Sequence, residues 1–102
     1  MKRLEDLIEM ARSGELDQHC VYGPDGDIEV DGVYAVADYP SVVDDVAIYP
    51  SDITARGLSF LYAGDQFTDV IEVACDQVEE PSPTQIADSL RYYAEHDTFL
   101  EF

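Results

Sequence analysis

The segment from Leu58 to Val78, LSFLYAGDQFTDVIEVACDQV, decides the fold class because its hydrophobic pattern changes period halfway along. Residues 58 to 63 are mainly apolar and aromatic and end at Gly64-Asp65, which predicts a strand followed by a turn. Apolar side chains then recur at helical spacing, at Phe67, Val70, Ile71, Ala74 and Val78, opposite Asp69, Glu72 and Asp76. The composition of this second half favours a strand, but periodicity is the stronger signal, so we expect a helix over residues 65–78.

The beginning of the chain has a similar helical pattern. Leu4, Leu7, Ile8 and Ala11 fall at i, i+3, i+4 and i+7, which predicts an amphipathic helix over roughly residues 2 to 13. Gly14 is its expected end, because glycine readily takes the left-handed conformation that closes a helix.

A further helix is predicted after Ser82-Pro83-Thr84-Gln85. Serine can cap a helix, proline suits the first helical position, and a glutamine three residues after the cap can return a hydrogen bond to it. We expect this helix to run to about Glu95, with Ile86, Leu90 and Tyr93 facing inward.

The middle of the chain alternates short apolar runs with turn residues. Cys20 to Tyr22, Ile28 to Val30 and Val33 to Ala37 are predicted as short strands in hairpins, and residues 53–56 as a single helical turn. A chain of 102 residues with 46% hydrophobic content can bury one modest core. We therefore expect one α+β domain over residues 1–102, a small antiparallel sheet packed by an N-terminal helix and two C-terminal helices.

The charge of the chain restricts its partners. The sequence has 23 acidic residues and 5 basic ones, a formal net charge of −18, with no Lys or Arg between Arg12 and Arg56 or between Arg56 and Arg91. Direct binding to nucleic acid or to an anionic membrane is disfavoured, because both need basic side chains to neutralise phosphates. Ordinary surfaces mix charges of both signs. A basic protein surface, or cations, would be attracted.

Residues 23–32, GPDGDIEVDG, place an acid at every second position from 25 to 31. An EF-hand loop starting at Asp25 fails, because its sixth position is Val30 and its twelfth is Val36. A looser cation site stays open. In a strand, Asp27, Glu29 and Asp31 would share one face, either as solvated surface or as a mimic of a nucleic-acid backbone.

The candidate site comprises the acids of the central region and the two tyrosines that precede proline. We expect partner contacts from Asp25, Asp27, Glu29, Asp31, Asp38, Tyr39, Asp44, Asp45, Tyr49 and Asp52. The two tyrosines are the expected interface anchors, since tyrosine is enriched at binding hot spots.

Catalysis and metal binding have little support in the sequence. We interpret Cys20 and Cys75 as reduced, buried thiols of a cytoplasmic protein. Residues 1–16 have charges scattered through them and no apolar core region, so we expect them to be neither a signal peptide nor a membrane span. His19 and Cys20 would point to opposite faces of a strand, so they do not make a catalytic pair. We expect that the protein is not an enzyme and binds no metal or cofactor. The enzymatic alternative is hydrolysis by an acid pair such as Asp44 and Asp45.

The two ends of the chain carry a resemblance. Residues 90–99, LRYYAEHDTF, together with the opening helix from Leu4 to Ala11, resemble an uncharacterised family of small bacterial and phage domains with a tyrosine-rich last helix and an Asp-x-Phe element. The resemblance implies an α+β fold and no particular activity.

In size and composition the chain is similar to two groups of acidic inhibitors. These are phage proteins that block host defence nucleases, including anti-CRISPR and antirestriction DNA mimics, and immunity proteins that neutralise nuclease toxins. The expected function is therefore non-catalytic: the acidic surface binds the basic nucleic-acid-binding surface of a partner, a defence effector complex or, alternatively, a nuclease toxin. A further alternative is an acidic domain of a salt-adapted organism, since concentrated salt screens self-repulsion.

Overall fold

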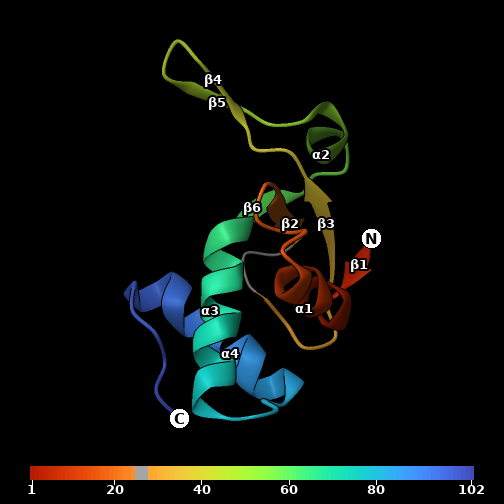
Figure 1. Cartoon of the computed structure of the whole chain (residues 1–102). Coiled ribbons are helices and arrows are strands. Elements are labelled where there is room, and N and C mark those ends of the chain that lie inside the picture. The colour runs from red at the N-terminus through yellow and green to blue at the C-terminus, as the bar shows by residue number, and fades with distance from the viewer. Residues whose placement is uncertain (25–27) are drawn as a thin grey trace.

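The computed structural model describes residues 1–24 and 28–102, and it is an α+β domain as the sequence predicts. Its elements are β1 (Lys2–Arg3), α1 (Leu4–Ser13), β2 (Cys20–Gly23), β3 (Val33–Ala37), β4 (Ser41–Val43), β5 (Val46–Ile48), α2 (Ser51–Ala55), β6 (Ser59–Ala63), α3 (Gly64–Gln77) and α4 (Pro83–His96). Figure 1 shows α1, α3 and α4 at one end of the molecule and the β4–β5 hairpin at the other.

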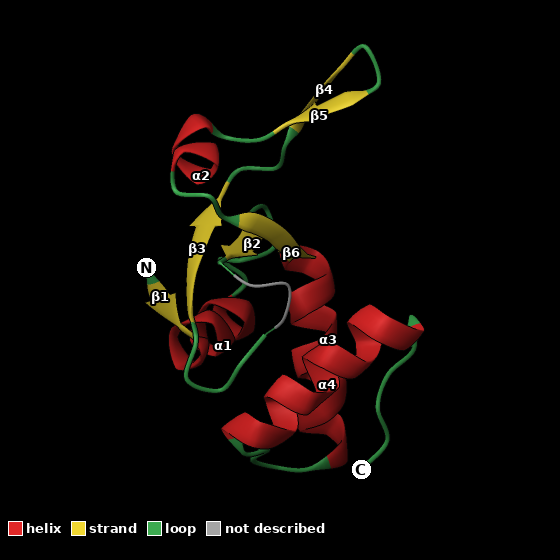
Figure 2. Cartoon of the chain, turned by 180° about the vertical axis from the view of Figure 1, so that it is seen from behind, coloured by secondary structure: helices red, strands yellow, loops and turns green. Residues whose placement is uncertain are grey.

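The described strands form an antiparallel four-stranded sheet in the order β1-β3-β2-β6 and a separate β4–β5 hairpin. β2 is central, and Val21 pairs with Val36 on one side and with Tyr62 on the other. The register between β2 and β6 shifts after Val21. Figure 2 shows the sheet between the long helices and α2.

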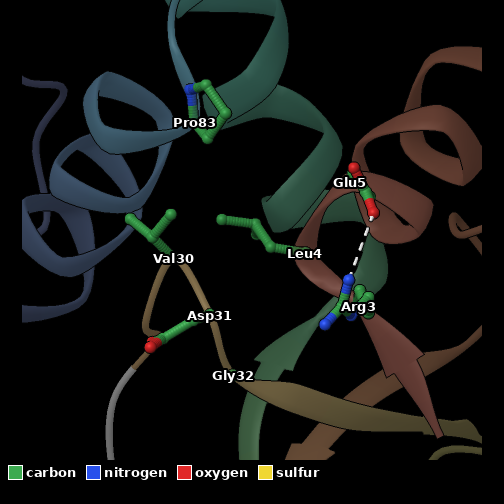
Figure 3. A pocket seen from close by; sticks show the side chains of 7 residues that line it. All are labelled: Arg3, Leu4, Glu5, Val30, Asp31, Gly32 and Pro83. Atoms are coloured by element: carbon green, nitrogen blue, oxygen red, sulfur yellow. Dashed lines mark ion pairs between the residues drawn. The ribbon is translucent and has the colours of Figure 1, made fainter.

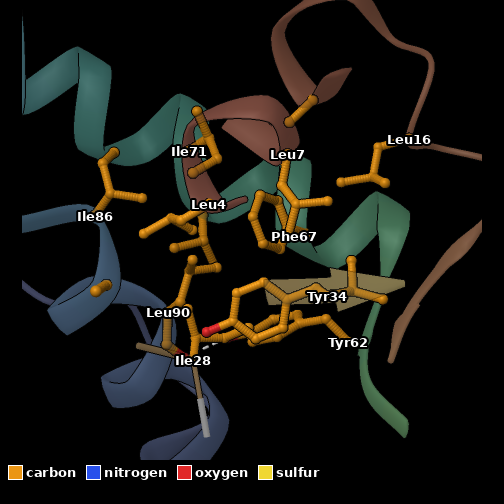
Figure 4. Packing of buried hydrophobic residues seen from close by; sticks show 14 of the residues in the cluster. Leu4, Leu7, Leu16, Ile28, Tyr34, Tyr62, Phe67, Ile71, Ile86 and Leu90 are labelled. Atoms are coloured by element: carbon orange, nitrogen blue, oxygen red, sulfur yellow. Dashed lines mark hydrogen bonds between the residues drawn. The ribbon is translucent and has the colours of Figure 1, made fainter. Parts of the chain in front are cut away.

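Successive side chains of a strand point to opposite faces, and in β2 the side chains on both faces are buried. Val21 packs into the main core, whereas Cys20 and Tyr22 pack with Ile53 of α2 into a second, smaller cluster. Figure 4 shows the main core between α1, α3, α4 and the sheet, with Leu4, Leu7, Leu16, Ile28, Tyr34, Tyr62, Phe67, Ile71, Ile86 and Leu90 labelled.

The helix signals in the sequence are confirmed. The Ser82 hydroxyl accepts a hydrogen bond from the Gln85 backbone at 3.1 Å, and the Gln85 side chain accepts one from the Ser82 backbone at 2.8 Å. Gly14 ends α1 with φ 83°. α1 begins at Leu4 rather than at Lys2, because Lys2–Arg3 pairs with β3.

β6 continues into α3 without a loop, and Gly64 makes this possible. Its backbone N–H donates to the His19 carbonyl at 2.8 Å. A Cβ at residue 64 would lie 1.8 Å from the Leu16 carbonyl oxygen, a distance that only glycine avoids. The helix predicted for residues 65–78 is confirmed as α3. Its first residue packs against the segment before β2.

The predicted strand from Ile28 to Val30 is wrong. These residues are irregular, with a turn at Val30–Asp31, and Ile28 is buried while Val30 is exposed. The Tyr34 hydroxyl accepts a hydrogen bond from the Glu29 N–H and donates one to the Glu29 carbonyl, so the tyrosine takes both groups that a neighbouring strand would pair. Of the three acids expected to share one face of this strand, only Glu29 and Asp31 lie within the described residues, and they are in this turn.

The β4–β5 hairpin was not predicted from the sequence. Val43 pairs with Val46 across a two-residue turn, in which Asp44 and Asp45 have φ 52° and 64°. Positive φ at both central residues is the geometry of a type I′ turn, which matches the twist of paired strands. Asp tolerates this conformation better than most residues but is less favoured there than Asn or Gly, so the sequence signal was weak.

Candidate functional site

The candidate residues separate into two groups at opposite ends of β3. Glu29 and Asp31 precede the strand; Asp38, Tyr39, Asp44, Asp45, Tyr49 and Asp52 follow it. A five-residue strand is roughly 13 Å long between its first and last Cα atoms, so the two groups do not form one patch. Asp25 and Asp27 lie outside the described residues.

The end of the molecule near Glu29 carries basic as well as acidic side chains. The Glu29 carboxylate lies 3.8 Å from the Arg91 guanidinium, which also bonds Asp88 at 2.6 Å. A small pocket beside it is lined by Arg3, Leu4, Glu5, Val30, Asp31, Gly32 and Pro83. Figure 3 shows this pocket with the Arg3–Glu5 ion pair, whose charged atoms are 4.0 Å apart. With two arginines close by, this group does not form an uninterrupted acidic surface.

Asp38 and Tyr39 occupy the opposite end of β3. The Tyr22 hydroxyl donates to the Asp38 backbone carbonyl at 2.8 Å, which fixes the chain where it leaves the sheet. The Asp38 carboxylate lies 3.7 Å from Nδ1 of His19. The Tyr39 hydroxyl donates to the Asp65 carboxylate at 3.4 Å, so Tyr39 connects this end of the sheet to the first turn of α3.

Tyr49 and Asp52 lie on either side of Pro50, where the chain enters α2. The Tyr49 ring meets the buried Tyr22 ring edge to face, with centroids 6.1 Å apart, while much of Tyr49 remains exposed. Asp52 is exposed in the first turn of α2, where a carboxylate interacts favourably with the helix dipole. Tyr49 is therefore positioned by its contact with Tyr22 and is also accessible to a partner, as an interface anchor requires.

Asp44 and Asp45 form the turn of the β4–β5 hairpin. Their backbone geometry accounts for their presence in the sequence as a pair, and both side chains are exposed at the tip. Neither carboxylate takes part in an ion pair among the described residues. The arrangement supports a surface role for these two acids.

A row of exposed acids on α3 was missing from the predicted site. Asp65, Asp69, Glu72 and Asp76 are exposed on α3 at i, i+4, i+7 and i+11, opposite the residues that pack into the core. We call these four residues the acidic stripe; it extends about 17 Å along the helix axis. None of the described ion pairs includes a member of the stripe. The sequence signal was present, because the same periodicity that predicted α3 placed these acids on one face.

Two observations concern metal ligands and the Cys20 thiol. No group of three His, Cys, Asp or Glu side chains among them is arranged to hold a metal ion. Burial raises the pKa of the Cys20 thiol, which disfavours the reactive thiolate. Within the described part of the chain, every helix is too short or too polar to cross a membrane.

Comparison with known proteins gives a family and nothing more specific. No curated protein and no solved structure matches the chain. One family model, described as a domain of unknown function (DUF7716), matches residues 1–102, the whole length of the chain. This match is consistent with the resemblance of the two ends of the chain to an uncharacterised family of small domains. The chain belongs to the DUF7716 family.

Proposed function

We propose that this protein is a non-catalytic inhibitor, active in the cytoplasm, that covers the basic nucleic-acid-binding surface of a partner protein. The observation that carries the proposal is the acidic stripe on α3, unpaired among the described residues and joined to the anchor Tyr39 through Asp65. The contact surface then consists of the stripe and Asp38, Tyr39, Tyr49 and Asp52, and it no longer depends on Glu29 and Asp31.

The stripe is unfavourable for the isolated protein. Like charges three or four residues apart, such as Asp65–Asp69 and Asp69–Glu72, each destabilise a helix by about 0.2–0.5 kcal/mol. A partner with Lys and Arg side chains opposite these carboxylates removes that repulsion on binding. Complementary charge also accelerates encounter and makes association weaken with salt, while Tyr39 and Tyr49 supply contacts that are insensitive to salt.

The partner class follows from the same chemistry. A surface that normally binds phosphates presents basic side chains to a row of carboxylates. We favour a phage anti-defence role, in which the partner is a defence effector complex. In the alternative, the chain is an immunity protein that binds a nuclease toxin through the same surface. The gene neighbourhood separates the two, because an immunity gene lies beside its toxin gene.

The test is recovery of a partner from the native host followed by binding measurements over a range of salt concentrations. The variant Asp69→Asn/Glu72→Gln removes two stripe charges and keeps side-chain shape. The control Glu9→Gln/Glu15→Gln removes two exposed charges that are also outside the described ion pairs. The stripe variant should bind more weakly, with a smaller slope against salt, while the control keeps the wild-type slope. Equal slopes for both variants would refute the role of the stripe, and unfolding of the wild type in low salt would support salt adaptation instead.

A further inference from the structure

A groove lies between the end of α3 and residues 98–102, which follow α4; we call these five residues the tail. The groove has a volume of about 580 Å³, within the range of about 300–1,000 Å³ that is usual for ligand sites. Val73 and Asp76 line it from α3, and Phe99, Glu101 and Phe102 line it from the tail. Figures 1 and 2 both place the end of the tail beside the last turn of α3.

Three contacts hold the tail in this position. The Gln77 side chain donates a hydrogen bond to the Leu100 carbonyl at 2.9 Å and accepts one from the Phe102 N–H at 2.9 Å. The ring of Tyr93 on α4 packs against the ring of Phe99, with centroids 5.0 Å apart. The groove is therefore formed in the free protein, and a ligand does not have to order the tail in order to bind.

The lining of the groove combines negative charge with apolar surface. Asp76 and Glu101 are exposed, and neither takes part in an ion pair among the described residues. No Lys or Arg is among the described residues that line the groove. Beside these carboxylates, Phe99 and Phe102 have 38% and 46% of their surface exposed. The groove therefore suits a cationic group that is carried on an apolar stem.

Arginine has the chemistry that this lining requires. Its planar guanidinium packs on aromatic rings and carries five N–H donors for carboxylates, whereas the lysine ammonium is a compact, strongly hydrated charge. We propose that the groove binds an arginine side chain of the partner protein. The guanidinium bonds the carboxylates of Asp76 and Glu101. The stem of the arginine covers the exposed surface of Phe99 and Phe102.

The groove lies at one end of the acidic stripe, because Asp76 is the last residue of the stripe. Tyr39 contacts Asp65 at the other end, about 17 Å away along the helix axis. Arginine and tyrosine are both enriched among the residues that dominate binding energy. The inference rests on the proposed function for the kind of partner, and it adds that the partner presents an arginine at the Asp76 end of α3.

Peptide binding to the full chain tests the groove without the partner. The probes are acetyl-Leu-Arg-Leu-amide and the same peptide with citrulline or lysine in place of arginine. Citrulline keeps the shape of the side chain and removes its charge, whereas lysine keeps the charge. Backbone amide NMR shifts are recorded in about 0.15 M salt, where the screening length is about 8 Å. We expect shifts in residues 73–77 and 98–102, a Kd of about 1 mM for the arginine peptide, and binding about 5-fold weaker or more for the other two.

Two matched variants test the carboxylates. Asp76→Asn/Glu101→Gln removes both acids that line the groove. Glu9→Gln/Glu15→Gln changes the net charge equally and lies outside the groove. Binding of the arginine peptide should weaken about 5-fold or more in the first variant and stay within about 2-fold in the second. Circular dichroism of both variants checks folding.

Absence of shifts at about 5 mM arginine peptide would overturn the proposal, since the Kd would then be far above the expected value. Equal binding of the arginine and lysine peptides, or equal losses in the two variants, would also overturn it, because either result would indicate general attraction to a negative protein. None of these outcomes changes the salt slope of partner binding, which tests the stripe through Asp69 and Glu72. The failure of one proposal is therefore distinguishable from the failure of the other.

Discussion

The hydroxyl of Tyr34 holds both backbone polar groups of Glu29: it accepts a hydrogen bond from the N–H and donates one to the carbonyl oxygen at 3.0 Å. Tyr34 is buried in β3, five residues later in the chain, so the side chain of a strand residue organises the loop that leads into the strand. The ring also fills the space beside Gly32, where a Cβ would lie 2.2 Å from the hydroxyl oxygen.

Replacement of this hydroxyl should destabilise the fold. Tyr34→Phe leaves the Glu29 N–H without its partner in a part-buried loop, while the Glu29 carbonyl keeps only the hydrogen bond from the Gly32 N–H at 3.3 Å. We expect a loss of about 1–3 kcal/mol in the free energy of unfolding. Chemical denaturation measures the change. Tyr92→Phe is the control, because its hydroxyl makes no hydrogen bond among the described residues, and it should have almost no effect. Similar losses in both variants would contradict the role of Tyr34.

Stability should also fall at alkaline pH because of the buried phenols. Burial raises the pKa of Tyr22 to about 12 and raises the pKa values of Tyr34 and Tyr62 as well. The folded state then holds these protons more tightly than the unfolded state, so their contribution is complete below the ordinary tyrosine pKa of about 10 and is lost as pH rises through the folded pKa. The Tyr22 contribution is therefore lost between about pH 10 and about pH 12.

Denaturation at a series of pH values, with tyrosinate absorbance recorded in parallel, measures this effect. Tyr22→Phe removes one of the phenols and should flatten the alkaline decline compared with wild type. An equally steep decline in the variant would show that other groups are responsible.

Gly64 is expected to tolerate no side chain. Gly64→Ala brings a methyl group against the carbonyl oxygens of Leu16 and His19, at 1.8 and 2.4 Å, so backbone must move. Overpacking of this kind costs about 1–3 kcal/mol or more. Gly57→Ala is the comparison: its φ of 68° is strained for alanine, but nothing lies within 4 Å of the added atom. If thermal unfolding showed a smaller loss for Gly64→Ala than for Gly57→Ala, the close approach would not be a constraint.

Asp97 gives the opposite prediction, a gain in stability. It ends α4 with φ 57°, a left-handed conformation that costs a residue with a Cβ about 1–2 kcal/mol, and its negative charge lies at the unfavourable end of the helix dipole. Asp97→Gly should raise the midpoint of thermal unfolding. Asp97→Asn separates the two causes, since it removes the charge and keeps a side chain. A lower midpoint in both variants would mean that the Asp97 carboxylate makes a favourable contact.

The helices could be predicted because their signals are local. Ser82 and Gln85 are three residues apart, and the periodicity that begins at Phe67 is contained within α3. The same periodicity contains the acidic stripe, which could have been proposed from the sequence had the polar face of the helix been weighed along with the apolar one. The propensity of this segment for a strand was overridden by burial of a single helical face.

The errors lie where the deciding contact is not part of the hydrophobic pattern. Alternation in residues 28–30 predicts a strand, but Tyr34 pairs with Glu29 in place of a neighbouring strand. β1 is only two residues long and exists because β3 lies beside it. Neither the side-chain hydrogen bonds of Tyr34 nor the pairing of β1 with β3 can be read from the alternation of apolar and polar residues. The β4–β5 hairpin was missed for a different reason, since Asp44-Asp45 is an unusual pair for the turn it makes.

That turn supplies a final prediction about the β4–β5 hairpin itself. Asp45 has φ 64°, so Asp45→Gly should relieve strain and slow amide hydrogen exchange in residues 41–48, whereas Asp45→Val places a β-branched residue in a conformation it avoids and should speed exchange there. Both variants remove the same charge, so a difference between them reports backbone geometry alone. Amides of β2 serve as the internal control, because the β4–β5 hairpin is separate from that sheet. Equal exchange in the two variants would mean that the positive φ of Asp45 does not determine the stability of the hairpin.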